Sequence, residues 1–326
     1  MGTAAAIGRK SIQFANVAVN AAVLIVILLL LAFSCYSLWD SNQVFSLASA
    51  AQYEKYKPSE EDGGLSFSEL QAINPDVFAW INVYGTHIDY PVVQGKDNKK
   101  YVNRDAQDKY SIAGSLFLDA HNSRDFSDSS SIIYGHHMEK RAMFGEIGLF
   151  TEKSFFDARR YGTLYYEGRE HGLEIFAFIQ TNAFDYELYR TNIAGKTEQR
   201  DYLDLLLRQA QHARADITVT AEDRFVLLST CSDNTTNGRS VLVGRITDEI
   251  HEDPFESKTT DAHPVIDTLT NLWMRIPVWG WLAAAALLLA LLAVILTRII
   301  KKKQKPGPYN NPKRRSKKSS KGVQKV

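Results

Sequence analysis

Two stretches of the chain are apolar over the length that a membrane span requires. No charged residue occurs between Ser11 and Trp39, and the core of this stretch, Val17–Leu38, is almost wholly apolar. Near the other end, Val278–Thr297 has the same character. A helix needs about 20 apolar residues to cross a bilayer. Both stretches are therefore predicted to be transmembrane helices, since a buried core helix would be shorter and would carry a polar stripe.

A cleaved signal peptide is an alternative for the first stretch. Its apolar run is longer than the roughly 7–15 residues of a signal h-region, and no small-x-small cleavage site follows it cleanly. The anchor is therefore the preferred interpretation.

Between the two spans the pattern changes to short apolar runs. They are rich in Val, Ile, Tyr and Phe and are bounded by Gly, Asn, Asp or Pro, which is typical of β-strands. Many short strands at regular spacing indicate a closed barrel or a sandwich. The predicted strands are Phe78–Val83, His87–Val93, Ser115–Leu118, Ser131–Tyr134, Gly162–Tyr166, Glu174–Gln180, Asp216–Thr220, Phe225–Thr230 and Ser240–Thr247.

Helical spacing interrupts the strands. Residues 66–74, SFSELQAIN, have a helix-start signature in which Ser66 or Ser68 caps the helix and Glu69 lies in its first turn. The longest helix is predicted over Glu198–Ala213, where apolar and charged residues fall on opposite faces. Its predicted inner face consists of Tyr202, Leu205, Leu206 and Gln209, and shorter helical segments are expected at Gln43–Tyr56 and Met143–Phe150.

The charges beside the two spans indicate their orientation. Arg9 and Lys10 precede the first span, and the tail after Thr297 is rich in Lys and Arg without one acidic residue. Positive flanks stay in the cytoplasm, so both termini are predicted to be cytoplasmic and the middle of the chain to lie outside the cell. Nucleic-acid binding is an alternative for the tail, but a basic run after a span more simply stops transfer and contacts anionic lipid.

The net charge of +1 hides an uneven distribution. All 37 acidic residues lie between the two spans, whereas fourteen of the 38 Lys and Arg residues lie outside them. The exported part is therefore acidic. It is not expected to bind nucleic acid or another polyanion, and it would tolerate a cationic substrate or an amine nucleophile.

The chain has only two cysteines, Cys35 in the first span and Cys231 at the end of a predicted strand. They cannot easily meet, so no internal disulfide is expected, and a lone exported thiol indicates reactivity. A small buried hydrophobe is the alternative role for a free cysteine. A nucleophilic cysteine also needs a cationic neighbour or a base.

Two segments supply candidate partners for Cys231. An apolar strand ends within IIYGHHM, and His136 and His137 follow at its tip. Asn237-Gly238 is a hairpin-turn signal, and the strand that returns from it would bring Arg239 close to Cys231. An always-charged guanidinium there favours the thiolate and can donate to an oxyanion. Taken alone, His136 and His137 would each be interpreted as a solvated loop residue, and Arg239 as a surface residue beside a strand.

These segments together resemble a known family. IIYGHHM, LLSTC and NGRSVLVGRI, in this order on an exported barrel-like chain, look like the sortases, the cysteine transpeptidases of Gram-positive cell envelopes. IDYPVVQGKDNKKYVNRD, GSLFLDAHNSRDFSD and MFGEIGLF resemble class B. The resemblance covers Ser66–Ile250. It implies a mainly β fold, a sortase-type closed barrel of about eight strands with N-terminal helices and one long inserted helix.

The resemblance also implies site residues. The nucleophile of the family falls on Cys231, its histidine on His136 and its arginine on Arg239. Ser229 and Thr230 are expected to line the substrate groove beside the thiol.

Two assignments stay open. His137 stands where the family often has Asn, so it is a helper or a bystander. Arg245 shares a strand face with Arg239 and is a rival for its role. The histidine pair with Glu139 has no recognised ligand spacing and no third ligand, so neither a metal nor a cofactor is expected.

The implied activity is that of a membrane-anchored cysteine transpeptidase. It would cleave a C-terminal sorting motif of secreted proteins through a thioester acyl-enzyme and transfer them to a peptidoglycan amine. The implied partners are sorting-motif proteins, a peptidoglycan precursor amine and membrane lipid. Alternatives are a Cys–His peptidase that hydrolyses and a non-catalytic barrel that binds wall material.

The chain departs from class B in its second predicted span, which resembles the pilus-building class C. Pilin polymerisation is therefore a further alternative. That class has a lid with an Asp-Pro-aromatic tripeptide before the barrel. Here Asp253-Pro254-Phe255 follows the barrel and is interpreted as linker.

The expected organisation is one exported domain between two anchors in the cell membrane. Its parts are a cytoplasmic N-terminus (1–16), a transmembrane helix (17–38), an extracellular linker and helix (39–65), the sortase-like catalytic domain (66–250), a linker (251–277), a second transmembrane helix (278–297) and a basic cytoplasmic tail (298–326).

Overall fold

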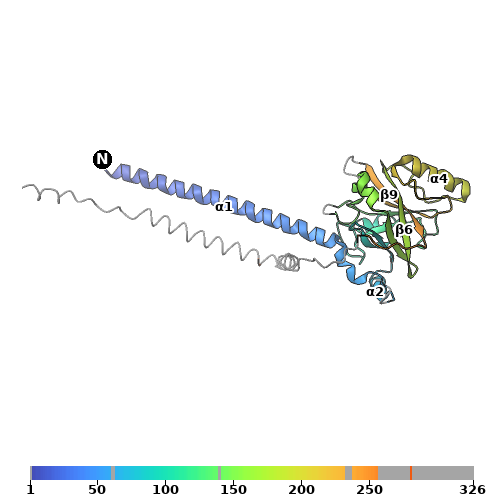
Figure 1. Ribbon diagram of the computed structural model, residues 1–326. Coiled ribbons are helices and arrows are strands. Elements are labelled where there is room, and N and C mark those ends of the chain that lie inside the picture. Colours follow the sequence, from blue (N-terminus) through green and yellow to red (C-terminus); the bar gives the residue numbers. More distant parts are fainter. Residues whose placement is uncertain (1, 60–62, 139–140, 232–236, 256–279, 281–326) are drawn as a thin grey trace, which may run out of the picture. The chain divides into compact units, whose positions relative to one another are not determined.

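The N-terminal part of the chain is one continuous helix, α1 (Gly2–Ala48), in a computed structural model that describes residues 2–59, 63–138, 141–231, 237–255 and 280 (Figure 1). Within α1, Phe14–Asp40 is the one segment of the described chain that is long and apolar enough to cross a membrane. The first predicted span lies in this segment. The second predicted span and the basic tail lie outside the described residues, apart from Gly280.

Eight strands close into a barrel in the order β5-β1-β2-β3-β4-β8-β9-β6, because β6 also pairs with β5. This confirms the predicted closed barrel. A further strand, β7, pairs with β6 outside the ring. The strands are β1 (Val77–Val83), β2 (Asp89–Val93), β3 (Leu116–Leu118), β4 (Ser130–Tyr134), β5 (Tyr161–Tyr166), β6 (Arg169–Asn182), β7 (Ala210–Ala213), β8 (Phe225–Cys231) and β9 (Gly238–Thr247).

The barrel closes through β6, which is twice as long as predicted. Its first part pairs with β5, its later part pairs with β7, and β9 follows its other edge from Gly172 to Asn182. The prediction of Glu174–Gln180 omitted the polar start of the strand. A tight turn explains this start, because Glu167 and Gly168 both have positive φ and send the chain straight back along β5.

The predicted strand Asp216–Thr220 is wrong, and so is the predicted end of the long helix at Ala213. The helix, α4 (Gly195–Gln209), stops earlier, and the next four residues form β7. Beyond Glu174, β6 no longer pairs with β5 and needs another partner along that edge. Backbone groups in a buried sheet must be paired. Residues 210–213 therefore form a strand, although their sequence spacing is helical.

The remaining helices are short. Helix α2 (Leu65–Ile73) forms as predicted, but its capping differs: Gly64, at φ 78°, is the N-cap, and Glu69 is not in the first turn. The hydroxyl groups of Ser66 and Ser68 donate instead to the carbonyls of Lys57 and Gly64. The other short elements are η1 (Ala50–Gln52), η2 (Glu54–Tyr56), η3 (Lys100–Val102), η5 (Ile147–Thr151) and α3 (Lys153–Ala158). The helical segment predicted over Gln43–Tyr56 is divided among the end of α1, η1 and η2. The turn predicted over Met143–Phe150 begins only at Ile147.

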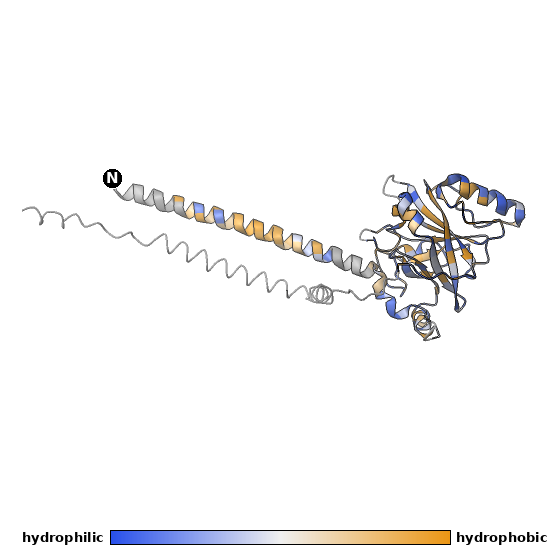
Figure 2. Ribbon diagram, in the orientation of Figure 1, coloured by the Kyte–Doolittle hydropathy of each residue, from blue (hydrophilic) through white to orange (hydrophobic). Residues whose placement is uncertain are grey.

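Alternation along β8 divides the apolar side chains between two layers. Val226 and Leu228 belong to the cluster that fills the barrel, whereas Phe225 and Leu227 belong to a cluster under α4 on the outer face. Helix α4 is amphipathic (Figure 2) and buries Tyr202, Leu203 and Leu206 in that outer layer. The odd-numbered positions of β8, which include Cys231, therefore share the outer face.

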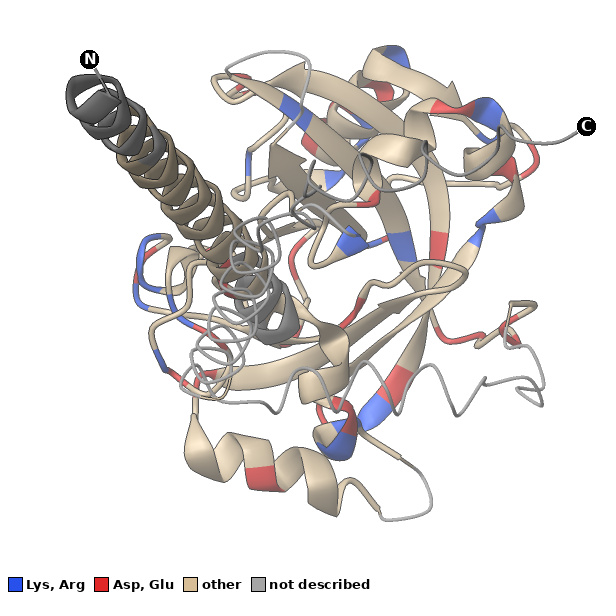
Figure 3. Ribbon diagram, turned by 90° about the vertical axis from the view of Figure 1, so that its left-hand side faces the viewer, with Lys and Arg blue, Asp and Glu red and all other residues tan. Residues whose placement is uncertain are grey.

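Charged residues of both signs are interspersed over the strands and loops of the described domain (Figure 3). Lys57, which follows α1 and η2, forms an ion pair with Asp89 at 2.5 Å, whereas the end of α1 itself is held by buried contacts. The hydroxyl of Tyr90 donates to the carbonyl of Ala48 at 2.9 Å and accepts from the amide of Met143 at 3.0 Å. One buried side chain thus joins the end of α1 to the segment that follows β4.

His171 on β6 is a buried polar side chain with no hydrogen bond among the described residues to offset its removal from water. It is 2% exposed, and its ring stacks on Tyr166 with centroids 4.1 Å apart. Neither ring nitrogen has a hydrogen-bond partner among the described residues. Burial, together with the positive charges of Arg169 and Arg224, lowers the pKa of His171 in the folded protein.

This histidine should make stability depend on pH. The unfolded chain takes up the proton at a pKa of about 6.5, whereas the folded protein resists it, so the free energy of unfolding should fall as the pH drops below that value. His171→Phe should remove this contribution to the decrease in the free energy of unfolding. It should also raise the free energy of unfolding at pH 7.5 by about 1 kcal/mol. Urea unfolding of the full chain in detergent at pH 7.5 and 5.5 measures both effects, and an equal fall in wild type and variant would contradict the assignment.

Candidate active site

Parallel pairing brings the ends of β4 and β8 to the same rim of the barrel. The register runs from Ser130 opposite Phe225 to Tyr134 opposite Ser229. The amide of Gly135 donates to the carbonyl of Ser229 at 3.1 Å, which extends the pairing beyond β4. Paired strands lie about 4.8 Å apart. His136 and Cys231, each two residues beyond the Tyr134–Ser229 pair, therefore leave neighbouring strand ends.

Antiparallel pairing places Arg239 directly opposite Cys231 in the β8–β9 register. The side chain of Cys231 is exposed, which excludes a buried hydrophobe as its role. The guanidinium of Arg239 is half-buried and donates to the carbonyl of Gly238 at 2.9 Å. The two strand pairings together bring Cys231, His136 and Arg239 to one rim of the barrel.

The rival arginine lies at the other end of the hairpin. Arg245 is opposite Phe225, six residues from Cys231 along β8, or about 20 Å. Its Nε and Nη2 atoms donate to Glu174 Oε2 at 2.9 and 2.7 Å, and its Nη1 atom donates to the carbonyl of Thr218 at 2.8 Å. Arg245 is thus engaged in a separate ion pair.

Two tyrosines that the sequence did not identify as site residues lie beside the thiol. The hydroxyl of Tyr189 bonds the hydroxyl of Ser229 at 2.9 Å, and its ring lies 6.3 Å from the ring of Tyr134. Burial raises the pKa of Tyr189, although the hydrogen bond with Ser229 and the positive charge of Arg239 act in the opposite direction. Nothing in the sequence distinguishes Tyr189 from the nearby Tyr186.

Ser229 and Thr230 occupy opposite faces of β8, and each is 2% exposed. Ser229 shares the outer face with Cys231 and contacts Tyr189. Thr230 shares the face of Val226 and Leu228, which point into the barrel. Its hydroxyl has no hydrogen-bond partner among the described residues. Of the two, only Ser229 lies on the side of the thiol.

The segment that carries His136 is held from several sides. His136 accepts an amide hydrogen bond from Phe144 at its carbonyl, at 3.1 Å, and the backbone of His137 pairs with Met143. Gly135 is required for close packing, since a Cβ there would lie 2.4 Å from Leu116 Cδ2 and 2.6 Å from Phe144 Cδ2. The imidazole of His136 meets the carbonyl of Val102, with 2.8 Å between Nε2 and the oxygen.

The segment after β9 packs onto the barrel at the β1–β2 turn. The hydroxyl of Tyr84 donates to the carbonyl of His251 at 3.0 Å, and the rings of His251 and Tyr161 stack at 3.9 Å. Phe255 covers Gly85, where an added Cβ would lie 2.6 Å from its ring. The described start of the predicted linker is thus an ordered strap. Within the described ranges, no cluster of three or more His, Cys, Asp or Glu could hold a metal ion, and Glu139 lies outside those ranges.

Known proteins are similar to this chain in fold and in sequence. Sortase B of Listeria monocytogenes is 33% identical over 182 residues, which are 55% of this chain and 72% of the relative. The solved sortase B from the type II pilus of Streptococcus pneumoniae is 48% identical with a TM-score of 0.50, over 56% of this chain and 99% of that one. A Streptococcus pyogenes class B sortase involved in pilus biogenesis is 43% identical with a TM-score of 0.51, over 56% and 98%. No protein-family model matches the chain.

The two arginines should differ in their effect on stability. Arg245→Met leaves Glu174, which is 7% exposed, without two of its hydrogen bonds and should lower the free energy of unfolding by about 2 kcal/mol. Arg239→Met removes only a local contact and should change it by less than about 0.5 kcal/mol. Urea unfolding measures both variants, and equal losses would contradict the separation of their roles.

Proposed function

The chain belongs to the sortase family and is class B-like, and from this we propose that Cys231, His136 and Arg239 carry out a transpeptidation at the barrel rim. Membership makes the chain a cysteine transpeptidase. The observation that carries the assignment of residues is the register, which sets an exposed Cys231 opposite Arg239 and beside the strand end that leads to His136.

The proposed reaction has two acyl transfers. The Cys231 thiolate attacks the carbonyl carbon of the scissile peptide bond, and His136 gives a proton to the departing amine, which leaves a thioester. An acceptor amine then attacks the thioester and gives a proton to His136. The thiolate departs, and a new amide bond joins the sorted protein to the acceptor.

Arg239 is proposed to stabilise the oxyanion that forms in both steps. Donors placed where negative charge develops are often the largest single contribution to catalysis. Ser229, Tyr134 and Tyr189 form the wall beside the thiol and are proposed to contact the sorting motif. Thr230 as a groove residue remains a prediction from the sequence.

Membrane attachment is proposed through α1. Its apolar segment would hold the barrel at the outer face of the cell membrane, where secreted substrates and lipid-linked acceptors reside. The basic flank at Arg9 and Lys10 supports a cytoplasmic N-terminus. The second anchor and the cytoplasmic C-terminal tail are proposed on composition alone.

The proposed acceptor is a peptidoglycan amine. A second candidate is the lysine amine of a pilin subunit. It is supported by the sequence identity to the two pilus sortases, 48% and 43%, which is higher than the 33% identity to the Listeria sortase B. The two candidates share every step up to the thioester. They differ only in the amine that resolves it.

The thioester should be directly detectable. A fluorogenic pentapeptide library incubated with the full chain in detergent should yield an acyl-enzyme by mass spectrometry, and Cys231→Ala should abolish it. Addition of a wall-peptide amine or of a lysine side-chain amine should convert the thioester to an amide product. Hydrolysis alone, whichever amine is added, would favour a Cys–His peptidase, and full activity of Cys231→Ala would rule out a cysteine enzyme.

Arg239→Lys should lower kcat/KM by roughly 100-fold or more, because lysine lacks the planar fork of donors. His136→Ala should be nearly inactive. Arg245→Met is the matched control, and its folded fraction should keep wild-type kcat/KM. An active Arg239→Ala together with an inactive, folded Arg245→Met would reverse the assignment of the two arginines.

A further inference from the structure

We propose that the main-chain carbonyl of Val102 positions the catalytic imidazole, holding His136 as the Nε2–H tautomer so that Nδ1 exchanges the proton. The proposal rests on the proposed function of His136 as acid and base. It adds a residue that neither the sequence motifs nor the strand register indicated, on a turn that lies more than thirty positions earlier in the chain.

The contact fixes which nitrogen donates. A carbonyl oxygen can only accept, so the 2.8 Å contact between Nε2 and the Val102 oxygen requires a proton on Nε2. A neutral imidazole has one donor and one acceptor nitrogen. Nδ1 is therefore the nitrogen with a free lone pair, and it is the one that can take a proton during acyl transfer. A base oriented by a third group is the arrangement that activated nucleophiles share.

The carbonyl itself is held in place by the backbone around it. The amide of Ser115 donates to the carbonyl of Tyr101 at 3.0 Å, and the hydroxyl of Ser115 donates to the carbonyl of Arg104 at 2.7 Å. Gly114 passes close beside the turn, at φ +62°, and an added Cβ would lie 2.6 Å from the carbonyl oxygens of both Tyr101 and Val102. Only glycine fits there without moving the Val102 oxygen.

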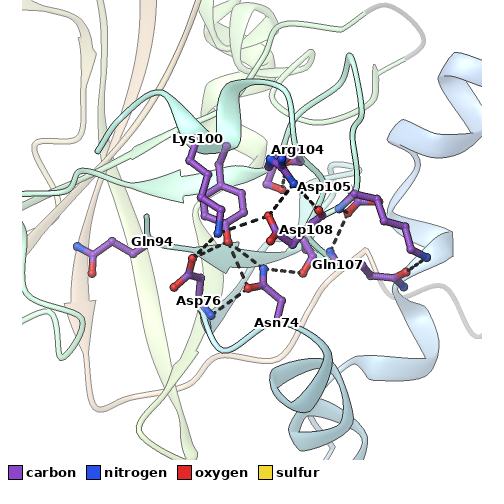
Figure 4. Close-up of polar contacts among 12 residues, drawn as sticks. Asn74, Asp76, Gln94, Lys100, Arg104, Asp105, Gln107 and Asp108 are labelled. Atoms are coloured by element: carbon purple, nitrogen blue, oxygen red, sulfur yellow. Dashed lines mark hydrogen bonds and ion pairs between the residues drawn. The ribbon is translucent and has the colours of Figure 1, made fainter. Parts of the chain in front are cut away.

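Side-chain contacts also hold this turn, among them those of Asn74, Asp76 and Lys100 (Figure 4). Tyr101 is fully buried, and its hydroxyl donates to Asp76 at 2.8 Å and accepts from Asn74 at 3.0 Å. Lys100 donates to the same Asp76 carboxylate at 2.9 Å and lies 3.4 Å from Asp108. The three-residue turn η3 is thus fixed at two successive side chains, and the third residue, Val102, presents its carbonyl to His136.

Val102 leaves 40% of its surface exposed and contributes little to the core, yet the two residues before it are bound to a shared carboxylate. A neutral carbonyl orients the ring without adding a negative charge beside the thiolate. The turn is thereby suited to position the base rather than to stabilise a permanent ion pair.

Two matched glycine substitutions test the proposal. Gly114→Ala places a methyl group against the Val102 carbonyl, whereas Gly168→Ala has a similar positive φ, +79°, with nothing within 4 Å of the added Cβ. Both carry the same type of backbone strain, but only the first displaces the proposed positioning group. Tyr101→Phe is a second variant that keeps the core filled and removes the bonds to Asp76 and Asn74.

The readouts are the tautomer and the kinetics of the full chain in detergent. Nitrogen-15 NMR should show His136 of the wild type as Nε2–H when neutral, with its signals identified by their loss in His136→Gln. Gly114→Ala should mix the tautomers and lower kcat roughly ten- to a hundredfold, with KM for the acylating pentapeptide nearly unchanged. Tyr101→Phe should show the same effects to a smaller extent, and Gly168→Ala should show neither.

The proposal is overturned if neutral wild-type His136 is protonated on Nδ1, or if folded Gly114→Ala matches Gly168→Ala in kcat. It is also overturned if Tyr101→Phe keeps both the wild-type tautomer and the wild-type kcat while Gly114→Ala does not fold. Failure of the proposed function looks different. In that case Cys231→Ala would stay active or no thioester would form, whatever the tautomer of His136.

Discussion

The structure depends on one parallel strand pairing, between β4 and β8. Parallel neighbouring strands end at the same edge of the sheet. This pairing can therefore place His136, which follows Tyr134, beside Cys231, although 95 positions separate them. A slip of one residue would turn Cys231 toward the barrel interior, because side chains alternate between the two faces. Apolar residues on both faces of β8 oppose such a slip, with Val226 and Leu228 inside the barrel and Phe225 and Leu227 under α4.

Closure of the barrel secures that pairing. β8 lies between β4 and β9, and β9 is held along ten residue pairs by β6, which also joins β5 to complete the ring. No strand of the ring has a free edge along which it could shift. The rim is then completed by loops with their own restraints, of which the buried turn at Tyr101 and the packing around Gly135 bear most directly on His136. The barrel determines where the three groups emerge, and the loops determine how they point.

The sequence predicted what depends on neighbours along the chain. The β8–β9 hairpin follows from a turn signal between two apolar runs, and it already placed Arg239 near Cys231. The long helix follows from periodicity in the same way, and the first span follows from the length of its apolar run. The strand pattern left a barrel or a sandwich open, and the closed barrel was implied by the resemblance to the sortases. The contact of His136 with Val102, the position of Tyr189 and the pairing of β7 with β6 were not predictable, because they depend on which distant segments meet. The helix-cap error at Ser66 has a local cause, since Gly64 can adopt the left-handed conformation that the start of α2 requires.

The contacts of Tyr90 bear on where a recombinant fragment of this protein should begin. The hydroxyl of Tyr90 bonds two segments of the chain, Ala48 at the end of α1 and Met143 in the loop that follows His136. A recombinant domain trimmed past residue 48 for solubility would lose the acceptor of that hydroxyl, and the loop would lose a fixed support. Rate constants from a trimmed domain would then describe a less rigid enzyme than the full chain, so the start of an expression fragment would affect the measured kinetics.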